Sequence, residues 1–262
     1  MVQNHLGAQQ RSNIFSPMDS QKIDMLVHTA QRIMTDSKDP IHDIAHVRRV
    51  VGYAQELGEA MQLGEDQQRA LILAAWWHDA GRTITKRPSM IVMPFFDDII
   101  SALMLWRETI RCRLFGKVVG MATRMIFCKS LGTGKILSKV LMRKQNRIMI
   151  DLLKDADTLD MLSIERSRQL YLLVDSSWIY SYGYKMVIWW TLSSNHLTVK
   201  THAAKKRLLQ LLELFVAWIK KQQVFNWHVT TFGRSWTTEQ INKGERLLQS
   251  LTQSFAHSIS LT

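Results

Sequence analysis

Residues 71–82 of the chain read LILAAWWHDAGR, and this stretch decides the fold class that the sequence predicts. Its apolar residues recur at helical spacing and share one face with His78. Gly81 is the expected C-terminal stop of this helix. His78 and Asp79 therefore project an imidazole and a carboxylate from one helix end, and such a pair can bind a divalent cation from two neighbouring directions. The apolar residues on the shared face are Leu71, Ala74 and Ala75.

Helical periodicity continues along most of the chain on both sides of this stretch. Interruptions are expected at the Asp-Pro pair 39–40, in a loop at 82–94, at Gly116 and in the turn SLGTG at 130–134. The segment 176–192, rich in tryptophan, tyrosine and β-branched residues, is the one place where a short strand could form. The predicted architecture is therefore all-α. The expected helical segments are residues 23–34, 46–64, 65–81, 96–130, 136–162 and 203–223, with a last helix from about Trp236.

The composition excludes several classes of protein. The chain has 262 residues, of which 46% are hydrophobic and 21% charged. This apolar share can build a sizeable core and excludes disordered, low-complexity and collagen-like chains. The last of only four prolines is Pro94, and so few turn residues weigh against an all-β sandwich. Because no repeat or linker divides the chain, we predict a flexible tail at residues 1–18 and a single helical domain at 19–262.

The sequence also carries information on the compartment. No run of eighteen uncharged apolar residues exists, so no transmembrane segment is expected. The first twenty residues contain no apolar run of the signal-peptide type. Cys112 and Cys128 are too few for a disulfide scaffold and lack the spacing of a metal site, which favours two reduced thiols. We therefore predict a cytoplasmic protein.

His46 and Asp157 stand at buried-face positions and, together with the His78-Asp79 pair, suggest a metal centre. His46 shares a helical face with Val50, and Asp157 follows Leu153 by four residues on the inward stripe of its segment. An unpaired buried carboxylate costs several kcal/mol and needs a cation or strong donors. One metal ion bound by His46, His78, Asp79 and Asp157 explains all of these placements, although Asp155 and Asp160 lie near enough to compete with Asp157. Such a mixed nitrogen and oxygen site suits manganese, iron, cobalt, nickel or zinc better than calcium.

In this order and spacing, the motifs resemble those of the HD-domain superfamily of metal-dependent phosphohydrolases. The resemblance covers about residues 38–162 and rests on HDIAHVRRVVGYA at 42–54, LILAAWWHDAGR at 71–82 and LLKDADTLD at 152–160. It implies an HD-like helical bundle and one divalent ion (Mn, Fe, Co, Ni, Zn or Mg). It also implies hydrolysis of a phosphate ester, such as a nucleotide or a related phosphorylated metabolite, by metal-activated water. The ligands implied are His46, His78, Asp79 and Asp157.

The chain also departs from parts of that superfamily. Dinuclear members carry further histidines between the HD pair and the last aspartate, and none stands between His78 and Asp157. This favours a mononuclear site and argues against oxygenase chemistry. A GYP motif is absent after the HD pair, which argues against hydrolysis of cyclic di-GMP. The helical extension at 163–262 resembles no family, so the substrate stays open.

Other polar residues around the motifs have two interpretations each. Arg82 could clamp a phosphate beside Asp79 as part of the catalytic site, or it could be an exposed loop arginine. Asp98 could hold a water or a second ion, or it could be a helix N-terminal charge. His42 could line the pocket, while its neighbour Asp43 is expected to cap the following helix.

The positive charge is concentrated in one segment. The formal net charge is +12, and residues 101–150 carry 11 basic side chains against a single acidic one, Glu108. A solvated helix face normally carries both signs, so we expect this segment to attract an anionic partner. In an enzyme it would steer a phosphorylated small molecule towards the metal. The alternative function is a non-catalytic HD-like scaffold that binds nucleic acid or an anionic membrane through residues 107–147.

Overall fold

The described part of the protein consists of α-helices and two short 3-10 helices. We describe it from a computed structural model that covers residues 17–39, 41–84, 93–129, 134–193 and 197–260. No strand occurs within these residues, which confirms the predicted all-α fold class. The predicted tail at 1–18 lies almost wholly outside them, but Pro17 and Met18 already belong to the first helix. None of the described helices combines the length and the apolar composition needed to span a bilayer.

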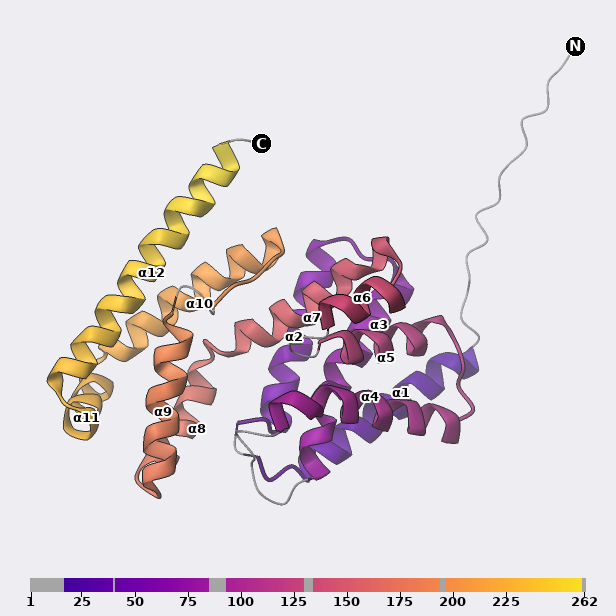
Figure 1. Ribbon diagram of the computed structural model, residues 1–262, viewed down its shortest axis with the longest axis horizontal. Helices are drawn as coiled ribbons and strands as arrows, with labels where there is room; N and C mark the ends of the chain where they lie inside the picture. The colour runs from indigo at the N-terminus through magenta and orange to yellow at the C-terminus, as the bar shows by residue number, and fades with distance from the viewer. Residues whose placement is uncertain (1–16, 40, 85–92, 130–133, 194–196, 261–262) are drawn as a thin grey trace, which may run out of the picture.

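The first seven helices form one group, on the right in Figure 1. In this group α2 packs against α3 and α7, and α3 also packs against α5. The α4 helix covers α5, and α1 lies against α3. The helices are α1 (Pro17–Thr35), α2 (Ile44–Ala60), α3 (Glu65–Trp77), α4 (Met93–Arg111), α5 (Lys117–Lys129), α6 (Gly134–Leu141) and α7 (Arg147–Asp160), with 3-10 helices at Ala80–Ile84 and Lys144–Asn146.

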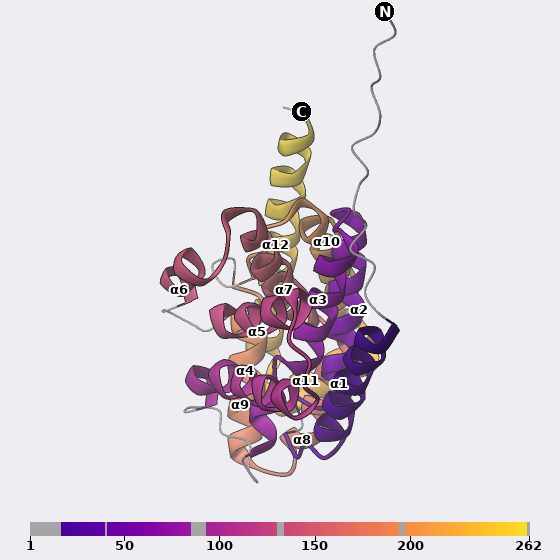
Figure 2. The same cartoon turned by 90° about the vertical axis from the view of Figure 1, so that its right-hand side faces the viewer.

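The last five helices form a second group, on the left in Figure 1. There α12 packs along α10 and α11, and α8 packs against α9. The two groups meet where α10 contacts α7 and α2, and one hydrophobic core runs from Ile23 to Leu247 through both. Figure 2 shows the same arrangement from the side. The helices are α8 (Ile164–Val174), α9 (Trp178–Thr191), α10 (His202–Lys220), α11 (Gln222–Phe232) and α12 (Arg234–Ser260).

The α2 helix begins where the sequence predicts a cap. The Asp43 side chain accepts a hydrogen bond of 2.8 Å from the backbone N–H of His46. Such a cap satisfies a donor that the first turn of a helix leaves unpaired. It fixes His46 in the first turn of α2, on the face that also buries Val47 and Val50. The cap and the apolar stripe together point the imidazole into the core.

The α7 helix holds the second group through Asp155. This carboxylate accepts hydrogen bonds of 2.9 Å from the backbone N–H groups of Lys200 and Thr201, and one of 2.8 Å from the Thr201 hydroxyl. Thr201 in turn caps α10 by accepting from the N–H of Ala204. Asp155 therefore joins the two groups of helices.

The short strand considered for residues 176–192 is wrong. Residues 178–191 form α9, which starts where the Ser177 hydroxyl accepts a hydrogen bond from the N–H of Ile179. Tyr184 and Ile188, one turn apart, are buried on its inner face. Packing at helical period has overridden the β-propensity of the individual residues.

Two expected boundaries also differ. The segment predicted as one helix at 136–162 is divided into α6, a 3-10 turn and α7. The loop predicted at 82–94 is shorter, because a 3-10 helix extends to Ile84 and α4 starts at Met93, while residues 85–92 lie outside the described part. The turn predicted at 130–134 lies outside it too, except for Gly134, the first residue of α6.

Gly81 is not the helix stop that its position suggests. The α3 helix ends at Trp77, and Gly81 lies inside the following 3-10 helix. A glycine is needed there because α4 passes very close. A Cβ atom at Gly81 would lie 2.6 Å from the carbonyl oxygen of Asp97 and 3.1 Å from the backbone nitrogen of Ser101.

We expect Gly81→Ala to lower the free energy of unfolding by about 1–3 kcal/mol, because the methyl group would force α4 away from the 3-10 helix. Gly52→Ala is the matched control. Gly52 lies inside α2 with no atom near its Cβ position, so alanine should stabilise the helix by about 0.5–1 kcal/mol. Urea denaturation followed by circular dichroism measures both. Equal stability of the two variants would contradict the close approach.

The second group of helices packs aromatic rings around the buried His228. The Tyr184 hydroxyl lies 2.8 Å from Nε2 of His228, and Nδ1 of His228 lies 2.7 Å from the carbonyl oxygen of Val224. Because a carbonyl can only accept, Nδ1 carries the proton and Nε2 accepts from the tyrosine. Burial lowers the pKa of His228, so the imidazole is neutral in the folded protein. Trp227, Phe232 and Trp236 pack around this pair.

The depressed pKa of His228 predicts a pH dependence of stability. The unfolded chain takes up this proton near the ordinary pKa of 6.5, whereas the folded chain does so only at lower pH. The free energy of unfolding should therefore fall as the pH drops below 6.5, by at most about 1.4 kcal/mol per pH unit. Denaturation of the wild type and of His228→Gln between pH 7.5 and 5 isolates the effect. Parallel stability curves for the two proteins would refute it.

Candidate metal centre

The predicted ligand residues converge at the centre of the first helix group. His46 lies in the first turn of α2, His78 and Asp79 directly follow α3, and Asp157 comes from α7. Ligand atoms of His46, His78 and Asp157 all lie within 4.8 Å of one another and could hold a metal ion. An oxygen of Asp79 completes the cluster, since its Oδ2 lies 3.1 Å from Nε2 of His46 and 3.4 Å from Nε2 of His78.

Both imidazoles are turned so that Nε2 faces the cluster. Nδ1 of His78 lies 2.7 Å from the carbonyl oxygen of Ala75 and must donate its proton to it. Nδ1 of His46 lies 2.6 Å from Oδ2 of Asp160. Such outer partners fix the ring orientation and the tautomer of metal-binding histidines. The Nε2 lone pair of His78 therefore points at the carboxylate oxygens.

Three buried atoms at this point have no partner in hydrogen-bond geometry, although the first and the last of them lie 3.1 Å apart: Nε2 of His46, Nε2 of His78 and Oδ2 of Asp79. All three belong to side chains that are at most 3% exposed. Unsatisfied buried polar atoms cost about 1–3 kcal/mol each, so three of them facing one point are rare in a stable core. A cation between them would satisfy all three, and the donor set fits a divalent transition metal.

The electrostatics of the cluster favour a positive charge. Burial would raise the pKa of Asp79, but the neighbouring His78 and His46 imidazoles and the Arg82 guanidinium outweigh it and hold this pKa well below its ordinary value. Burial would lower the pKa of His46, but the carboxylates of Asp160 and Asp79 outweigh it and raise this pKa. A proton or a metal ion is thus attracted to the same place. Burial keeps the pKa of His78 low, which leaves this imidazole neutral and able to bind metal.

Lys129 brings a buried ammonium group to the rim of the cluster. Its Nζ lies 2.9 Å from Oδ2 of Asp157 and 3.4 Å from Oδ1 of Asp98. Burial would lower the pKa of Lys129, but the two carboxylates outweigh it and hold this pKa well above its ordinary value. The lysine is therefore charged. It contacts one oxygen of Asp157, while the other oxygen faces the histidines.

Arg82 is not an exposed loop arginine, because only 13% of its side chain is accessible. It lies in the 3-10 helix Ala80–Ile84, and its Nη2 forms a 2.6 Å ion pair with Asp97. Its Nε lies 3.6 Å from Oδ1 of Asp79, and its Nη1 lies 3.9 Å from Asp39. The guanidinium group thus lies among three carboxylates and helps to hold Asp79.

His42 and Asp98 lie beside the cluster. The His42 ring packs edge-on against His46, with 5.4 Å between the ring centroids. Its Nδ1 contacts Asp39 and its Nε2 faces Arg166 at 3.3 Å, and burial lowers the pKa of His42 to about 4. Burial also raises the pKa of Asp98 to about 6, against the opposing charge of Lys129.

Asp160 is the outer carboxylate of the site and is wholly buried. Besides His46, it accepts a hydrogen bond of 2.5 Å from Nε of Arg49, and Arg166 lies 3.5 Å away. Asp160 therefore orients His46, and Asp155 holds α10. Of the three neighbouring aspartates, only Asp157 reaches the Nε2 atoms of the two histidines.

Sequence reasoning missed the roles of Lys129 and Asp160. Lys129 was assigned only to the basic segment, yet it follows Met125 by four residues on the buried face of α5. Asp160 likewise follows Ala156 by four residues on the buried face of α7. A charged residue on an apolar stripe is the signal that would have found both.

Comparison of the chain with protein-family models, with curated proteins and with solved structures finds no match. The function of the site is therefore inferred from its geometry and from the sequence motifs.

We expect Asp160→Asn to weaken divalent metal binding about 10- to 100-fold, because the amide cannot hold the His46 imidazole in the binding orientation as a carboxylate does. Asp155→Asn is the matched control on the same helix. It should disturb the α10 contact and lower metal affinity far less, because its effect reaches the histidines only through α7. Titration with Co²⁺, followed by its visible absorption, measures both affinities. Unchanged affinity in Asp160→Asn would contradict the assigned role.

Proposed function

We propose that this chain is a metal-dependent phosphohydrolase of the HD-domain type. The observation that carries the proposal is the group of three unsatisfied buried atoms on His46, His78 and Asp79, which face Asp157. The order of these residues in the sequence adds the resemblance to the HD superfamily. The fourfold set would hold one divalent ion through two nitrogens and two oxygens.

An ion in this place supplies two things to phosphate chemistry: it polarises a phosphoryl oxygen and lowers the pKa of a bound water. The remaining work falls to residues of the chain. Lys129 carries a fixed positive charge at the rim, next to Asp157, where it can bind a phosphoryl oxygen and stabilise the charge that develops there. Arg82 acts as a positioning residue because its guanidinium lies between Asp97 and Asp79.

The substrate class follows from charge. Lys129 favours an anionic group at the rim, and the surrounding segment 101–150 is strongly basic. A phosphate monoester or diester of a nucleotide or of a phosphorylated metabolite fits this surface. Long-range attraction by the basic segment would raise the association rate of such an anion.

Lys129→Met tests whether the lysine contributes to turnover but not to metal binding. We expect the variant to retain a divalent ion while kcat falls about 100- to 1,000-fold, because a donor to the developing charge is lost. Asp79→Asn, in contrast, should lose both metal binding and turnover. Metal content by mass spectrometry and release of inorganic phosphate from a panel of nucleotides and sugar phosphates are the measurements. The Gly52→Ala variant serves as the active control.

If the protein is instead a non-catalytic scaffold that binds nucleic acid, a different result is expected. This function requires that polynucleotide affinity falls steeply with salt. The slope of log K against log salt concentration should be about −0.9 per phosphate contact, and no phosphate ester should be hydrolysed with any metal. Wild-type protein that carries a metal but hydrolyses no phosphate ester of the panel would refute the enzyme proposal.

A further inference from the structure

Six large hydrophobic side chains are exposed along one helix, α9. Trp178 is 78% exposed and Tyr182 is 62% exposed, and the other members of the stripe are between 40% and 53% exposed. The stripe spans about 18 Å at the helical rise. Surface hydrophobic residues scattered singly are normal, but a contiguous stripe of this size marks an interaction site. We call it the α9 stripe; it consists of Trp178, Ile179, Tyr182, Met186, Trp189 and Trp190.

The α9 stripe carries no charge. The only charged residue between 178 and 191 is Lys185, and its Nζ lies 5.3 Å from the ring centroid of Phe232, on the inner side of the helix. The exposed Asp175 stands just before the stripe, and the chain beyond it is basic. Residues 176–212 contain five basic residues and no acidic one.

A second apolar patch lies where α4 meets α5. Leu103 is 59%, Ile110 50% and Phe115 66% exposed, and Trp106 stacks edge-on against Phe115. An open groove of about 330 Å³ runs beside Trp106, between Phe115 and Arg124. We call Leu103, Trp106, Ile110 and Phe115 the α4 patch.

The α4 patch is surrounded by positive charge. Exposed basic side chains stand on α4, on α5 and on α6, the helix that packs against α5. The one acidic residue of segment 101–150, Glu108, is buried and paired with Arg107 and Arg111. The basic residues that stand near it without a carboxylate partner among the described residues include Arg113, Arg124 and Lys139.

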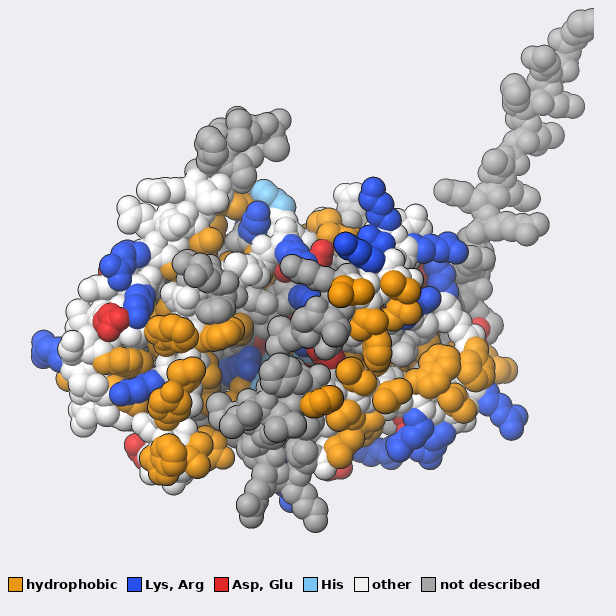
Figure 3. Space-filling model, in the orientation of Figure 1, with side chains coloured by type: hydrophobic (Ala, Val, Ile, Leu, Met, Phe, Trp, Pro, Cys, Tyr) orange, Lys and Arg blue, Asp and Glu red, His pale blue; other side chains and the backbone are white. Residues whose placement is uncertain are grey.

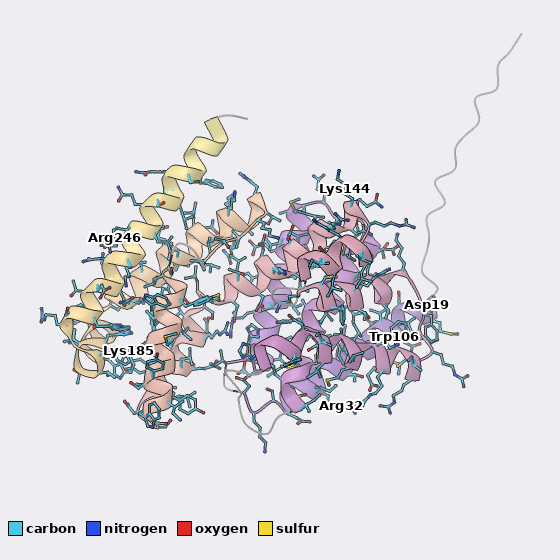
Figure 4. All side chains as sticks on the ribbon, in the orientation of Figure 1. Asp19, Arg32, Trp106, Lys144, Lys185 and Arg246 are labelled. Carbon is cyan, nitrogen blue, oxygen red and sulfur yellow. The ribbon has the colours of Figure 1, made fainter. Side chains whose placement is uncertain are left out.

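The two surfaces face the same side of the molecule. Figure 3 shows hydrophobic side chains gathered over α9 on the left and over α4 on the right, with blue side chains between and around them. The side view agrees, because α4, α6 and α9 lie along one edge in Figure 2. Trp106 and Lys185, labelled in Figure 4, mark the two helix groups to which the surfaces belong. A flat partner can therefore touch both at once.

We propose that this face docks onto an anionic phospholipid membrane, with the α9 stripe and the α4 patch in the headgroup region. Tryptophan and tyrosine are the residues that prefer the membrane–water interface, and flanking lysine and arginine add attraction to anionic lipid. A second copy fits less well, since it would bring two chains of net charge +12 together. A polynucleotide fits less well too. The aliphatic Leu103, Ile110 and Ile179 offer bases no stacking surface, and the α9 stripe has no cationic side chain that could bind a phosphate.

Flotation of the full chain with lipid vesicles tests the proposal. We expect binding to vesicles of phosphatidylcholine mixed with phosphatidylserine, and much weaker binding to phosphatidylcholine alone. The double variant Trp178→Ser, Tyr182→Ser should reduce partitioning at least about ten-fold, because both side chains leave water on docking. Arg124→Gln and Lys139→Gln should each reduce it about five-fold. Leu214→Ser, which changes a 56% exposed leucine on α10 outside both surfaces, should have no effect.

Three results would overturn the proposal: absence of binding to the anionic vesicles, equal binding of the double variant and the wild type, or a preference for single-stranded RNA or DNA over vesicles at equal salt. A dimer in analytical ultracentrifugation that dissociates in the double variant would assign the face to a second copy instead. If the double variant fails to fold, quenching of wild-type tryptophan fluorescence by brominated acyl chains decides, since docked tryptophans are quenched and solvated ones are not. This test is independent of phosphate hydrolysis, so the two proposals can fail separately.

Discussion

The unsatisfied nitrogen and oxygen atoms between α2, α3 and α7 constrain the rest of the first helix group. Two buried imidazoles whose Nε2 atoms face carboxylate oxygens are stable only with a positive charge among them. The surrounding groups fit this requirement. Asp160 accepts a hydrogen bond from Nδ1 of His46, the Ala75 carbonyl accepts one from Nδ1 of His78, and Arg82 lies against Asp79. The apolar packing of the three helices keeps these groups in place.

Charge around the cluster is arranged in layers. The innermost atoms are donors to a cation, and the next layer holds Lys129, Arg82, Arg49 and Arg166, each paired with an aspartate. Buried charges are tolerated only when paired and hydrogen-bonded in this way. Lys129 differs from the arginines because its carboxylate partner, Asp157, is itself 29% exposed. The ammonium group thus stands at the border between the core and the solvent, where an anion can approach it.

Much of this architecture was accessible from the residues alone, for a physical reason. The helices follow from 3.6-residue periodicity, and the inward position of His46 follows from the same periodicity because it shares a stripe with apolar residues. Asp157 lies at the edge of the buried face of α7, with 29% of its side chain exposed. Which of Asp155, Asp157 and Asp160 faces the histidines depends on the helix rotation within the bundle, which is a tertiary property. The role of Lys129 depends on α5 crossing α7, a contact between residues far apart in the sequence. The helical state of residues 178–191 was missed because it rests on the burial of Tyr184 and Ile188 against neighbouring helices rather than on propensity.

Within six residues of α7, three carboxylates have three different roles. Asp155 accepts hydrogen bonds from the N-terminus of α10, Asp157 faces Nε2 of the histidines and Asp160 orients His46. All three share one rigid backbone, so the helix cannot rotate to serve one duty without disturbing the other two. Filling of the central cluster and docking of the C-terminal helices are therefore thermodynamically linked. A cation that stabilises the position of α7 also stabilises its hydrogen bonds to the start of α10. By reciprocity, any interaction that stabilises the packing of α8–α12 on the first group raises the affinity for the cation.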